Sequence, residues 1–281
     1  MKIIKNQSFG GERPLFESHH LRLEQVTITE GESGLKHCSD IECDNCHFEG
    51  KYPLWHVDGS RLTRCYFAPG SRSAIWYSND MVVLDTIIDA PKLFREMNNL
   101  RLERVTINDA DETFWNIRGL KMNEVILRGG TYPFMGSRDI VIDGLDSDSK
   151  YVFQYVKNVT LRNAKITTKD AFWETEDVTI IDSELNGEYL GWHSKNLRLI
   201  NCRITGTQPL CYCQNLVMEH CTMGDDADLA FEYSTVHATI DSAVHSIKNP
   251  TSGVIEVKSV GEIIIDDNVR QPNDCKIITR S

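Results

Sequence analysis

Apolar and polar residues alternate in a short phrase that recurs along the chain at intervals of 19 to 21 residues. The phrase is clearest in residues 98–107, Asn-Asn-Leu-Arg-Leu-Glu-Arg-Val-Thr-Ile, and it returns in residues 157–166 and 195–204. Successive copies begin at residues 19, 39, 58, 79, 98, 118, 138, 157, 176, 195, 214 and 235. A repeat with this period predicts a solenoid in which each copy forms one coil.

The positions within each copy predict strands and corners. Counting from the first residue of a copy, positions 3 and 5 are apolar, as in Leu100 and Leu102, and so are positions 8 and 10, as in Val105 and Ile107. Alternation of this kind predicts two short strands that face one interior. Position 2 is Asn, Asp or Gly in ten copies, and these residues tolerate the left-handed backbone of a corner. An apolar residue four positions before most copies predicts a third strand.

Three short strands in a coil of about 20 residues predict an all-β, right-handed parallel β-helix of about twelve coils. A left-handed β-helix keeps a strict six-residue rhythm, which is absent here. A pentapeptide-repeat helix should not carry apolar residues at both positions 3 and 5. We expect a single domain over residues 1–281, with coils in 19–244, an N-terminal cap in 1–18 and a C-terminal cap or subunit contact in 245–281. Caps are expected because the end coils expose unpaired backbone.

Charge and hydropathy exclude some classes of partner. The net charge of −11 disfavours a nucleic acid, whose phosphates require clustered Lys and Arg. No apolar run is long enough for a transmembrane helix, and the N-terminus lacks the apolar run of a signal peptide, so we expect a cytoplasmic protein without a membrane partner. Gly10-Gly11-Glu12 does not open a helix after a strand, so no phosphate loop and no cofactor are expected.

The nine cysteines superficially suggest a metal site, because Cys43-x-x-Cys46 lies near Cys38 and Cys65. The repeat favours a different interpretation. Position 8 is the small core position, and it is occupied by Cys46, Cys65, Cys202 and Cys221. A free cysteine behaves as a small apolar residue in a core. We therefore expect structural thiols, no metal and, without an export signal, no disulfides.

All five tryptophans share one column, three residues before the next copy: Trp55, Trp76, Trp115, Trp173 and Trp192. The next column is mostly polar and aromatic: His37, His56, Tyr77, Glu96, Asn116, Gly136, Tyr155, Glu174, His193, Tyr212 and Tyr233. A bend between the two columns would bring both to one exposed face. One interpretation is an oligosaccharide-binding stripe, with indole faces against sugar rings. The alternative is a stabilising ladder or a homo-oligomer contact in a non-enzymatic scaffold.

Under the first interpretation, the candidate ligand-binding residues are Trp55, His56, Trp76, Tyr77, Trp115, Trp173 and Trp192. Glu174 and His193 occupy equivalent positions of adjacent coils, so their Cα atoms should lie about 5 Å apart. This pair is the candidate catalytic centre of a carbohydrate-active hydrolase or lyase. Further acid–base candidates are Glu96, Glu188, Glu232 and His56, although most carboxylates in so acidic a chain simply face solvent.

Four phrases resemble a known microbial family. They are residues 11–16 (Gly-Glu-Arg-Pro-Leu-Phe), 51–55 (Lys-Tyr-Pro-Leu-Trp), 187–192 (Gly-Glu-Tyr-Leu-Gly-Trp) and 229–234 (Leu-Ala-Phe-Glu-Tyr-Ser). They are similar to the family filed as domain of unknown function 3737. The resemblance implies a single-domain right-handed β-helix with no assigned activity and no catalytic residues to carry over. The architecture is also similar to that of pectate lyases and polygalacturonases, which bind polysaccharide along one face, but we find none of their calcium-site or Asp-pair signatures here.

Overall fold

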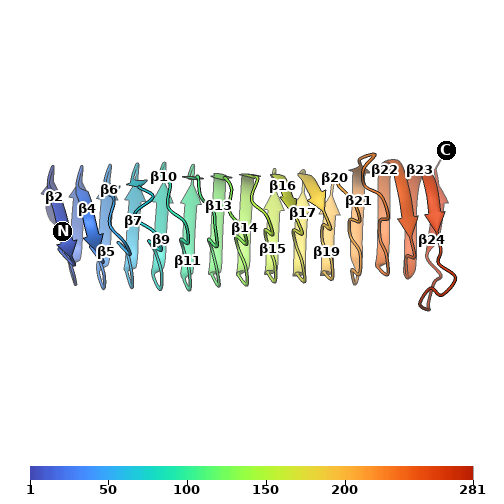
Figure 1. Cartoon of the computed structure of the whole chain (residues 1–281), viewed down its shortest axis with the longest axis horizontal. Helices are drawn as coiled ribbons and strands as arrows, with labels where there is room; N and C mark the ends of the chain where they lie inside the picture. The colour runs from blue at the N-terminus through green and yellow to red at the C-terminus, as the bar shows by residue number, and fades with distance from the viewer. Residues whose placement is uncertain (281) are drawn as a thin grey trace. The chain divides into compact units, whose positions relative to one another are not determined.

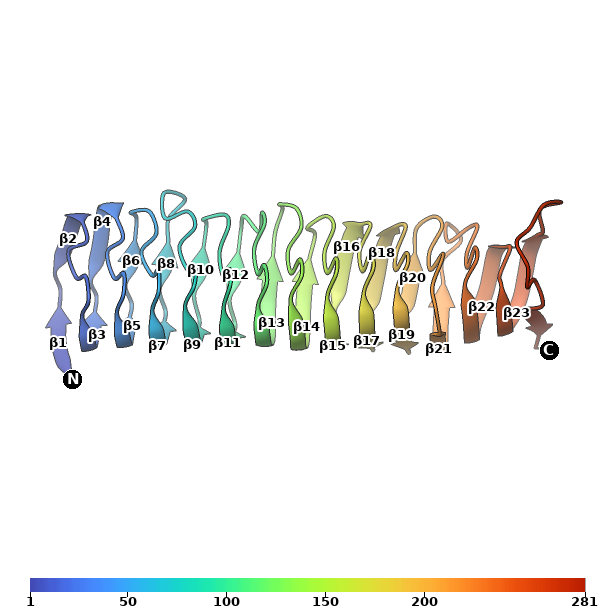
Figure 2. The same ribbon diagram turned by 90° about the horizontal axis from the view of Figure 1, so that it is seen from below.

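The structure is a computed structural model that describes residues 1–280. Those residues form strands and turns without an α-helix, so no helix in them could cross a membrane. The chain divides into two compact units, Met1–Ser149 and Lys150–Ser281. Each unit is a parallel β-solenoid in which strands from successive coils pair side by side (Figures 1 and 2).

The first unit contains two ladders of parallel strands. The first ladder comprises β1 (Lys2–Lys5), β3 (His19–Glu24), β5 (Ser39–Asp44), β7 (Asp58–Thr63), β9 (Asn79–Leu84) and β11 (Asn98–Glu103). The second comprises β2 (Ser8–Glu12), β4 (Thr27–Glu32), β6 (His47–Phe48), β8 (Tyr66–Phe67), β10 (Ile87–Ile88) and β12 (Thr106–Ile107). Two longer strands run through both ladders: β13 (Arg118–Leu127) and β14 (Arg138–Ser147).

The second unit repeats this plan. Its first ladder begins with β15 (Lys157–Arg162), β17 (Glu176–Ile181) and β19 (Lys195–Ile200), and its second with β16 (Lys165–Lys169), β18 (Glu184–Glu188) and β20 (Arg203–Thr205). The strands that follow are β21 (Leu216–Met223), β22 (Thr235–Lys248), β23 (Ser252–Ile264) and β24 (Lys276–Thr279). The strands of neighbouring coils pair in parallel throughout the unit.

The parallel β-solenoid predicted from the repeat is confirmed, but it has about 15 turns rather than twelve. The end segments account for the difference. Residues 1–18, expected to form a cap, contain β1 and β2, which pair with the first predicted coil. Residues 245–281, also expected to form a cap, contain the end of β22 and all of β23 and β24. These segments escaped the count because their sequences depart from the repeat while their backbones continue it.

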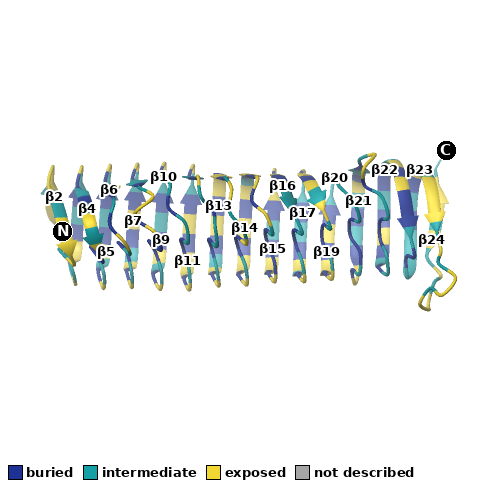
Figure 3. Ribbon diagram, viewed as in Figure 1, coloured by how far each residue is buried: buried dark blue, intermediate teal, exposed yellow. Residues whose placement is uncertain are grey.

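The predicted core columns are confirmed. Leu100, Leu102, Val105 and Ile107 are buried, and the same alternation of buried and more exposed residues marks most other strands, though not the end strands β1, β2 and β24 (Figure 3). Stacked rings fill the third side of each interior. Phe114 and Phe134 lie 4.9 Å apart in the first unit, and Phe153 and Phe172 lie 5.0 Å apart in the second.

The last repeat copy departs from its predicted register by one residue. Positions 3 and 5 of that copy are His237 and Thr239, but His237 is exposed, and Val236, Ala238 and Ile240 are buried instead. Leu216 accordingly pairs with Val236. A slip of one residue turns every side chain of a strand to the opposite face, so the predicted core positions of this strand were wrong.

Left-handed backbone forms the corners. At position 2, Asp80 and Asn99 have φ values of 52° and 58°, and the Asn99 amide donates a 2.8 Å hydrogen bond to Asp80. The predicted third strand is a turn instead. Glu112, Phe114 and Asn116 have φ values of 48°, 62° and 54°, which are incompatible with an extended strand. Backbone hydrogen bonds still join coils there, as from Phe114 N to Leu93 O at 3.1 Å.

Candidate functional site

The tryptophan column of the first unit is a continuous stack of rings and cations. The rings of Trp55 and Trp76 lie 5.4 Å apart and nearly parallel, at 9°. The Lys36 ammonium lies 5.7 Å from the Trp55 ring centroid. The Arg95 guanidinium lies 4.8 Å from the Trp76 ring and 4.2 Å from the Trp115 ring. Arg95 therefore fills the column between Trp76 and Trp115, and cation–π attraction continues the stack there.

Four of the five indole N–H groups donate to backbone carbonyls of the solenoid. Trp55 Nε1 donates to Ser73 O at 2.6 Å, and the corresponding bond from Trp192 to Gln208 O in the second unit measures 2.7 Å. Trp76 and Trp115 donate in the same way. Trp173 and Trp192 stack at 5.6 Å. Neighbouring rings and cations thus cover indole faces, and a sugar ring needs an open face for stacking.

This geometry favours the ladder interpretation of the tryptophans, while their role in ligand binding stays a prediction. The bend expected after the tryptophan column is present, because His56, Tyr77, Glu174 and His193 have φ values of 50° to 59°. The four side chains are exposed, whereas the tryptophans are half-buried. Their rings also stack from coil to coil, as in His56 on Tyr77 at 5.0 Å. Partial burial lowers the pKa of His56, and the neighbouring His37 and Lys36 charges lower it further.

Glu174 and His193 occupy adjacent coils, as predicted, and Glu174 N donates to Trp192 O at 2.9 Å. In the part of the chain described, their side chains form no hydrogen bond or ion pair with each other. His193 instead stacks on Tyr212 at 4.8 Å. The catalytic assignment of this pair therefore stays a prediction.

The three further carboxylates considered from sequence all have partners. Glu96 accepts a hydrogen bond from Asn116 at 2.6 Å. Glu188 forms an ion pair with Lys169 at 3.3 Å, and Glu232 forms one with Lys248 at 3.0 Å. Each of these contacts joins neighbouring coils, which gives the three carboxylates a structural role.

The cysteines lie where the repeat places them. Eight of the nine are buried, all nine are free thiols, and Cys275 is half-buried. Burial raises the pKa of Cys38 to about 11 and that of Cys211 to about 12. Within residues 1–280, no group of three or more Cys, His, Asp or Glu side chains is arranged to hold a metal ion.

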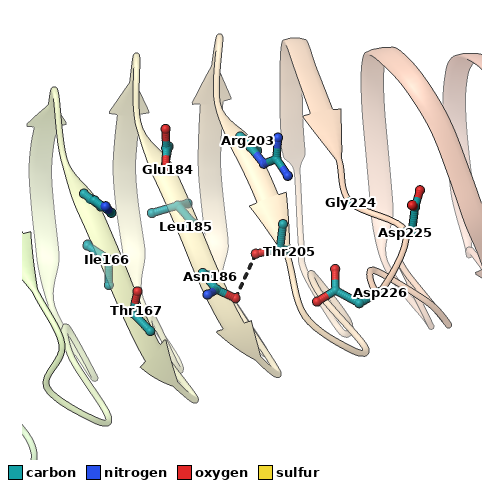
Figure 4. A pocket seen from close by; sticks show the side chains of 11 residues that line it. Ile166, Thr167, Glu184, Leu185, Asn186, Arg203, Thr205, Gly224, Asp225 and Asp226 are labelled. Atoms are coloured by element: carbon teal, nitrogen blue, oxygen red, sulfur yellow. Dashed lines mark hydrogen bonds between the residues drawn. The ribbon is translucent and has the colours of Figure 1, made fainter.

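A hollow of about 520 Å³ lies over the second ladder of the second unit, away from the tryptophan column (Figure 4). We call it the β16–β20 groove. It is lined by Lys165, Ile166, Thr167, Glu184, Leu185, Asn186, Arg203, Thr205, Gly224, Asp225 and Asp226. Sequence reasoning missed this feature.

Strand register arranges the groove in two rows. Lys165, Glu184 and Arg203 are paired positions of β16, β18 and β20 and form the charged row. Two residues further along the same strands, Thr167, Asn186 and Thr205 form the amide and hydroxyl row. Side chains two residues apart on a strand point to the same face, and adjacent strands lie about 4.8 Å apart, so each row repeats at that interval. Thr205 Oγ1 donates to Asn186 Oδ1 at 2.8 Å (Figure 4).

The charged groups of the groove have no protein partner. Among residues 1–280, the side chains of Lys165, Glu184, Arg203, Asp225 and Asp226 form no hydrogen bond or ion pair. The opposite ladder of the same unit differs. It carries a hollow of about 460 Å³, but there Asn196 donates to Asp177 at 2.8 Å and Arg198 donates to Glu219 at 2.6 Å. The β16–β20 groove thus presents open donors and acceptors, while several polar groups on the opposite ladder satisfy one another.

A loop closes one end of the groove. Residues 214–234 form a coil that is two residues longer than residues 195–213, and the additional length falls in the loop that carries Asp225 and Asp226. Gly224 lets this loop approach the strands. A Cβ at position 224 would meet Thr205 Cγ2 at 2.7 Å and Asp226 Oδ1 at 2.9 Å. The longer coil was a sequence signal for this loop, and residues 58–78 form the one other coil of that length.

Comparison with known proteins supports the fold. Residues 2–278 match the family described as "Protein of unknown function (DUF3737)". The surface adhesin PfbA of Streptococcus pneumoniae is 9% identical with a TM-score of 0.50, covering 96% of this chain and 86% of its own. At this identity the likeness concerns the fold alone.

Two further solved structures are weaker matches. The tailspike of E. coli bacteriophage HK620, solved with a pentasaccharide, has a TM-score of 0.49 at 8% identity and covers 97% of this chain and 71% of its own. The periplasmic alginate epimerase AlgG has a TM-score of 0.45 at 10% identity, with coverage of 99% and 76%. No curated protein matches the sequence.

Proposed function

This chain belongs to the DUF3737 family of proteins of unknown function, and we propose that it binds an oligosaccharide in the β16–β20 groove of its second unit. One observation carries the proposal: two rows of polar side chains repeat coil by coil in the groove, and its charged groups are unpaired. A ligand that fits must be extended, and it must offer many hydrogen-bonding groups at short, regular intervals.

An oligosaccharide meets both requirements. Its hydroxyl groups both donate and accept, which matches the ammonium, guanidinium, carboxylate, amide and hydroxyl groups of the groove. Groups that are solvated in the free protein can form these bonds without breaking protein contacts. A nucleic acid is a poorer fit, because its phosphate backbone requires clustered Lys and Arg, and only two cations, Lys165 and Arg203, line the groove.

The groove also contains groups capable of chemistry. Glu184, Asp225 and Asp226 are carboxylates, and enzymes that cleave glycosidic bonds use pairs of them as acid, base or nucleophile. We therefore include carbohydrate processing in the proposal, to be tested by incubating any bound glycan with the protein and analysing its length and stereochemistry.

Self-association through the His and Tyr column is the second candidate function. The exposed rings of Tyr77 (42%) and Tyr155 (45%) favour it, because large exposed aromatic side chains are typical of interfaces. Light scattering of the wild type and of a Tyr77→Ser, Tyr155→Ser variant tests this idea. An unchanged molar mass would remove it.

We also propose a reducing compartment, such as the cytoplasm, as the location. The support is that all nine cysteines are free thiols, including Cys202 and Cys221, which occupy the same core position of adjacent coils. Fractionation of producing cells would test the location, and recovery outside the cytoplasm would contradict it.

A glycan array tests the binding proposal. The informative variant is Asn186→Leu, Thr205→Val, which removes the hydrogen-bonding groups at two of the three positions of the amide and hydroxyl row while keeping the side chains similar in size. The matched control is Thr160→Val, Thr179→Val on the opposite ladder of the same unit. We expect the groove variant to lose binding by about tenfold and the control to keep it.

A third variant, Trp173→Ala, Trp192→Ala, tests the tryptophan column. If this variant alone abolishes binding while remaining folded, the stripe rather than the groove binds the glycan. If the wild type retains no glycan on the array, the proposed function is wrong.

A further inference from the structure

We propose that the oligosaccharide of the β16–β20 groove is acidic and carries its negative charge on uronate carboxylates. This inference rests on the proposed function and adds the substrate class. It starts from Lys165 and Arg203, two exposed cations that face the groove without an ion-pair partner.

In the charged row, one coil lies between the coils of the two cations. Lys165 and Arg203 flank Glu184 in register, so they lie on alternate coils, roughly 10 Å apart along the ladder. Neither forms an ion pair with Glu184, although a carboxylate stands between them. Figure 4 shows the Arg203 guanidinium directed away from Glu184, toward the coil that carries Gly224. The guanidinium is therefore available to a ligand.

Some cations elsewhere in this unit form ion pairs with a neighbouring coil. Lys157 forms a 2.6 Å ion pair with Glu176 on the first ladder, across one coil, and Arg198 forms one of 2.6 Å with Glu219. Such coil-to-coil pairing is one use of a basic residue in an acidic solenoid. In the charged row neither cation is paired, which leaves two positive charges for a ligand in a chain that has 41 acidic and 30 basic residues.

Arg203 suits a carboxylate in particular. Its planar guanidinium presents two parallel N–H donors, which match the two oxygens of a carboxylate. The acidic loop is placed to complement this contact: Asp225 and Asp226 lie at the end of the groove beyond Thr205, where they can accept hydrogen bonds from sugar hydroxyls (Figure 4). The two cations of the charged row can therefore bind carboxylates of the ligand, and the carboxylates at the end of the groove can accept hydrogen bonds from its hydroxyls.

Replacing Glu184 should change the affinity for an acidic ligand in the opposite direction to replacing either cation. Glu184 stands between the cations, so it repels an acidic ligand and has no such effect on a neutral one. Removing its charge should strengthen the binding of a uronate chain, whereas removing the charge of Arg203 or Lys165 should weaken it.

The experiment measures by calorimetry at low salt the binding of an oligogalacturonate and of its methyl ester, which lacks the negative charge and carries one additional methyl group on each carboxyl. The variants are Arg203→Gln, Lys165→Gln and Glu184→Gln, and the matched control is Arg162→Gln, an exposed arginine of β15 outside the groove. A sulfated neutral oligosaccharide of similar length is included as a second anion. Thermal unfolding of each variant confirms that it is folded.

We expect the wild type to bind the acid about tenfold more tightly than the ester, and Arg203→Gln to abolish that preference. Glu184→Gln should bind the acid a few fold more tightly without changing the ester. Arg162→Gln should match the wild type.

Three results would overturn the inference: equal binding of acid and ester, tighter binding of the sulfated chain, or equal effects of Arg203→Gln and Arg162→Gln. If the ester binds as well as the acid and Asn186→Leu, Thr205→Val weakens both, the proposed function stands and only the substrate class is wrong. If neither these ligands nor any glycan on the array binds, the proposed function itself fails.

Discussion

The guanidinium carbon of Arg95 lies 4.2 Å from the ring centroid of Trp115 and 4.8 Å from that of Trp76. Arg95 also forms a 2.6 Å ion pair with Glu112, and its side chain is only 12% exposed. An arginine thus replaces a ring in the column without interrupting it.

Replacing Arg95 should destabilise the first unit. Arg95→Met keeps the apolar stem but removes two cation–π contacts and the ion pair, so we expect a loss of about 1–3 kcal/mol in the free energy of unfolding. Urea unfolding measures it. Arg61→Met, at an exposed arginine of β7, is the control and should stay within about 0.5 kcal/mol of the wild type. Equal effects of the two substitutions would contradict the ladder account.

Replacing Ser60 should stabilise the protein. Ser60 occupies a core position that is apolar in most coils, and its buried Oγ has no hydrogen-bond partner. Because an unpaired buried hydroxyl is costly, we expect Ser60→Ala to raise the free energy of unfolding by about 1 kcal/mol. Ser78 is the matched control, since its Oγ donates to Leu54 O at 2.9 Å and accepts from Val57 N at 3.0 Å. Ser78→Ala should destabilise, and a stabilising effect there would count against the argument.

His56 should make stability depend on pH. Its pKa in the folded state is lowered below the ordinary value of 6.5, mainly by partial burial and then by the His37 and Lys36 charges. The unfolded chain therefore takes up the proton first as the pH falls through 6.5, and stability is lost below that value. His56→Phe keeps a ring on Tyr77 but cannot titrate, so its stability should fall less between about pH 7.5 and pH 5.5. An equal fall in both proteins would contradict this assignment.

The thiols should be protected in the native state. Eight cysteines are buried, and only Cys275 is half-buried, with burial raising its pKa to about 11. Because the thiolate is the reactive form, we expect a thiol reagent to label Cys275 alone, and slowly, in the folded protein. All nine should react after denaturation. Rapid labelling of Cys46 or Cys65 in the native state would indicate an accessible cluster rather than core thiols.

The repeat made much of the fold predictable from sequence. Its apolar columns indicate which side chains are buried, and Asn, Asp or Gly at position 2 indicates the left-handed backbone of a corner. Asn99 signals a left-handed corner by its chemistry, whereas Phe114 adopts the same conformation without a local signal. Side chains packed in the interior hold Phe114 in that conformation, so a strand was predicted where the chain turns. The end coils were missed for a related reason: their pairing depends on the neighbouring coil more than on their own pattern.

The candidate site was harder to predict because its residues look ordinary. Lys165, Glu184 and Arg203 each resemble a solvated surface charge, and only strand register places them in one row. The tryptophans attracted attention because they are rare and aligned, yet stacked neighbours cover their faces. Coil length gives a partial signal, since the two additional residues in 214–234 mark the loop at the end of the groove, but residues 58–78 are equally long.

An oligosaccharide bound in the β16–β20 groove should change the NMR signals of the residues that line it, and a titration can detect those changes. The protein is labelled with ¹⁵N and titrated with the best glycan from the array, while backbone amide shifts are followed in the wild type and in Asn186→Leu, Thr205→Val. The account predicts saturable shifts around residues 184–186 and 203–205 and at the loop of Asp225, which are lost in the variant. Shifts confined to Trp173, Trp192 and their neighbours, unchanged in the variant, would contradict it.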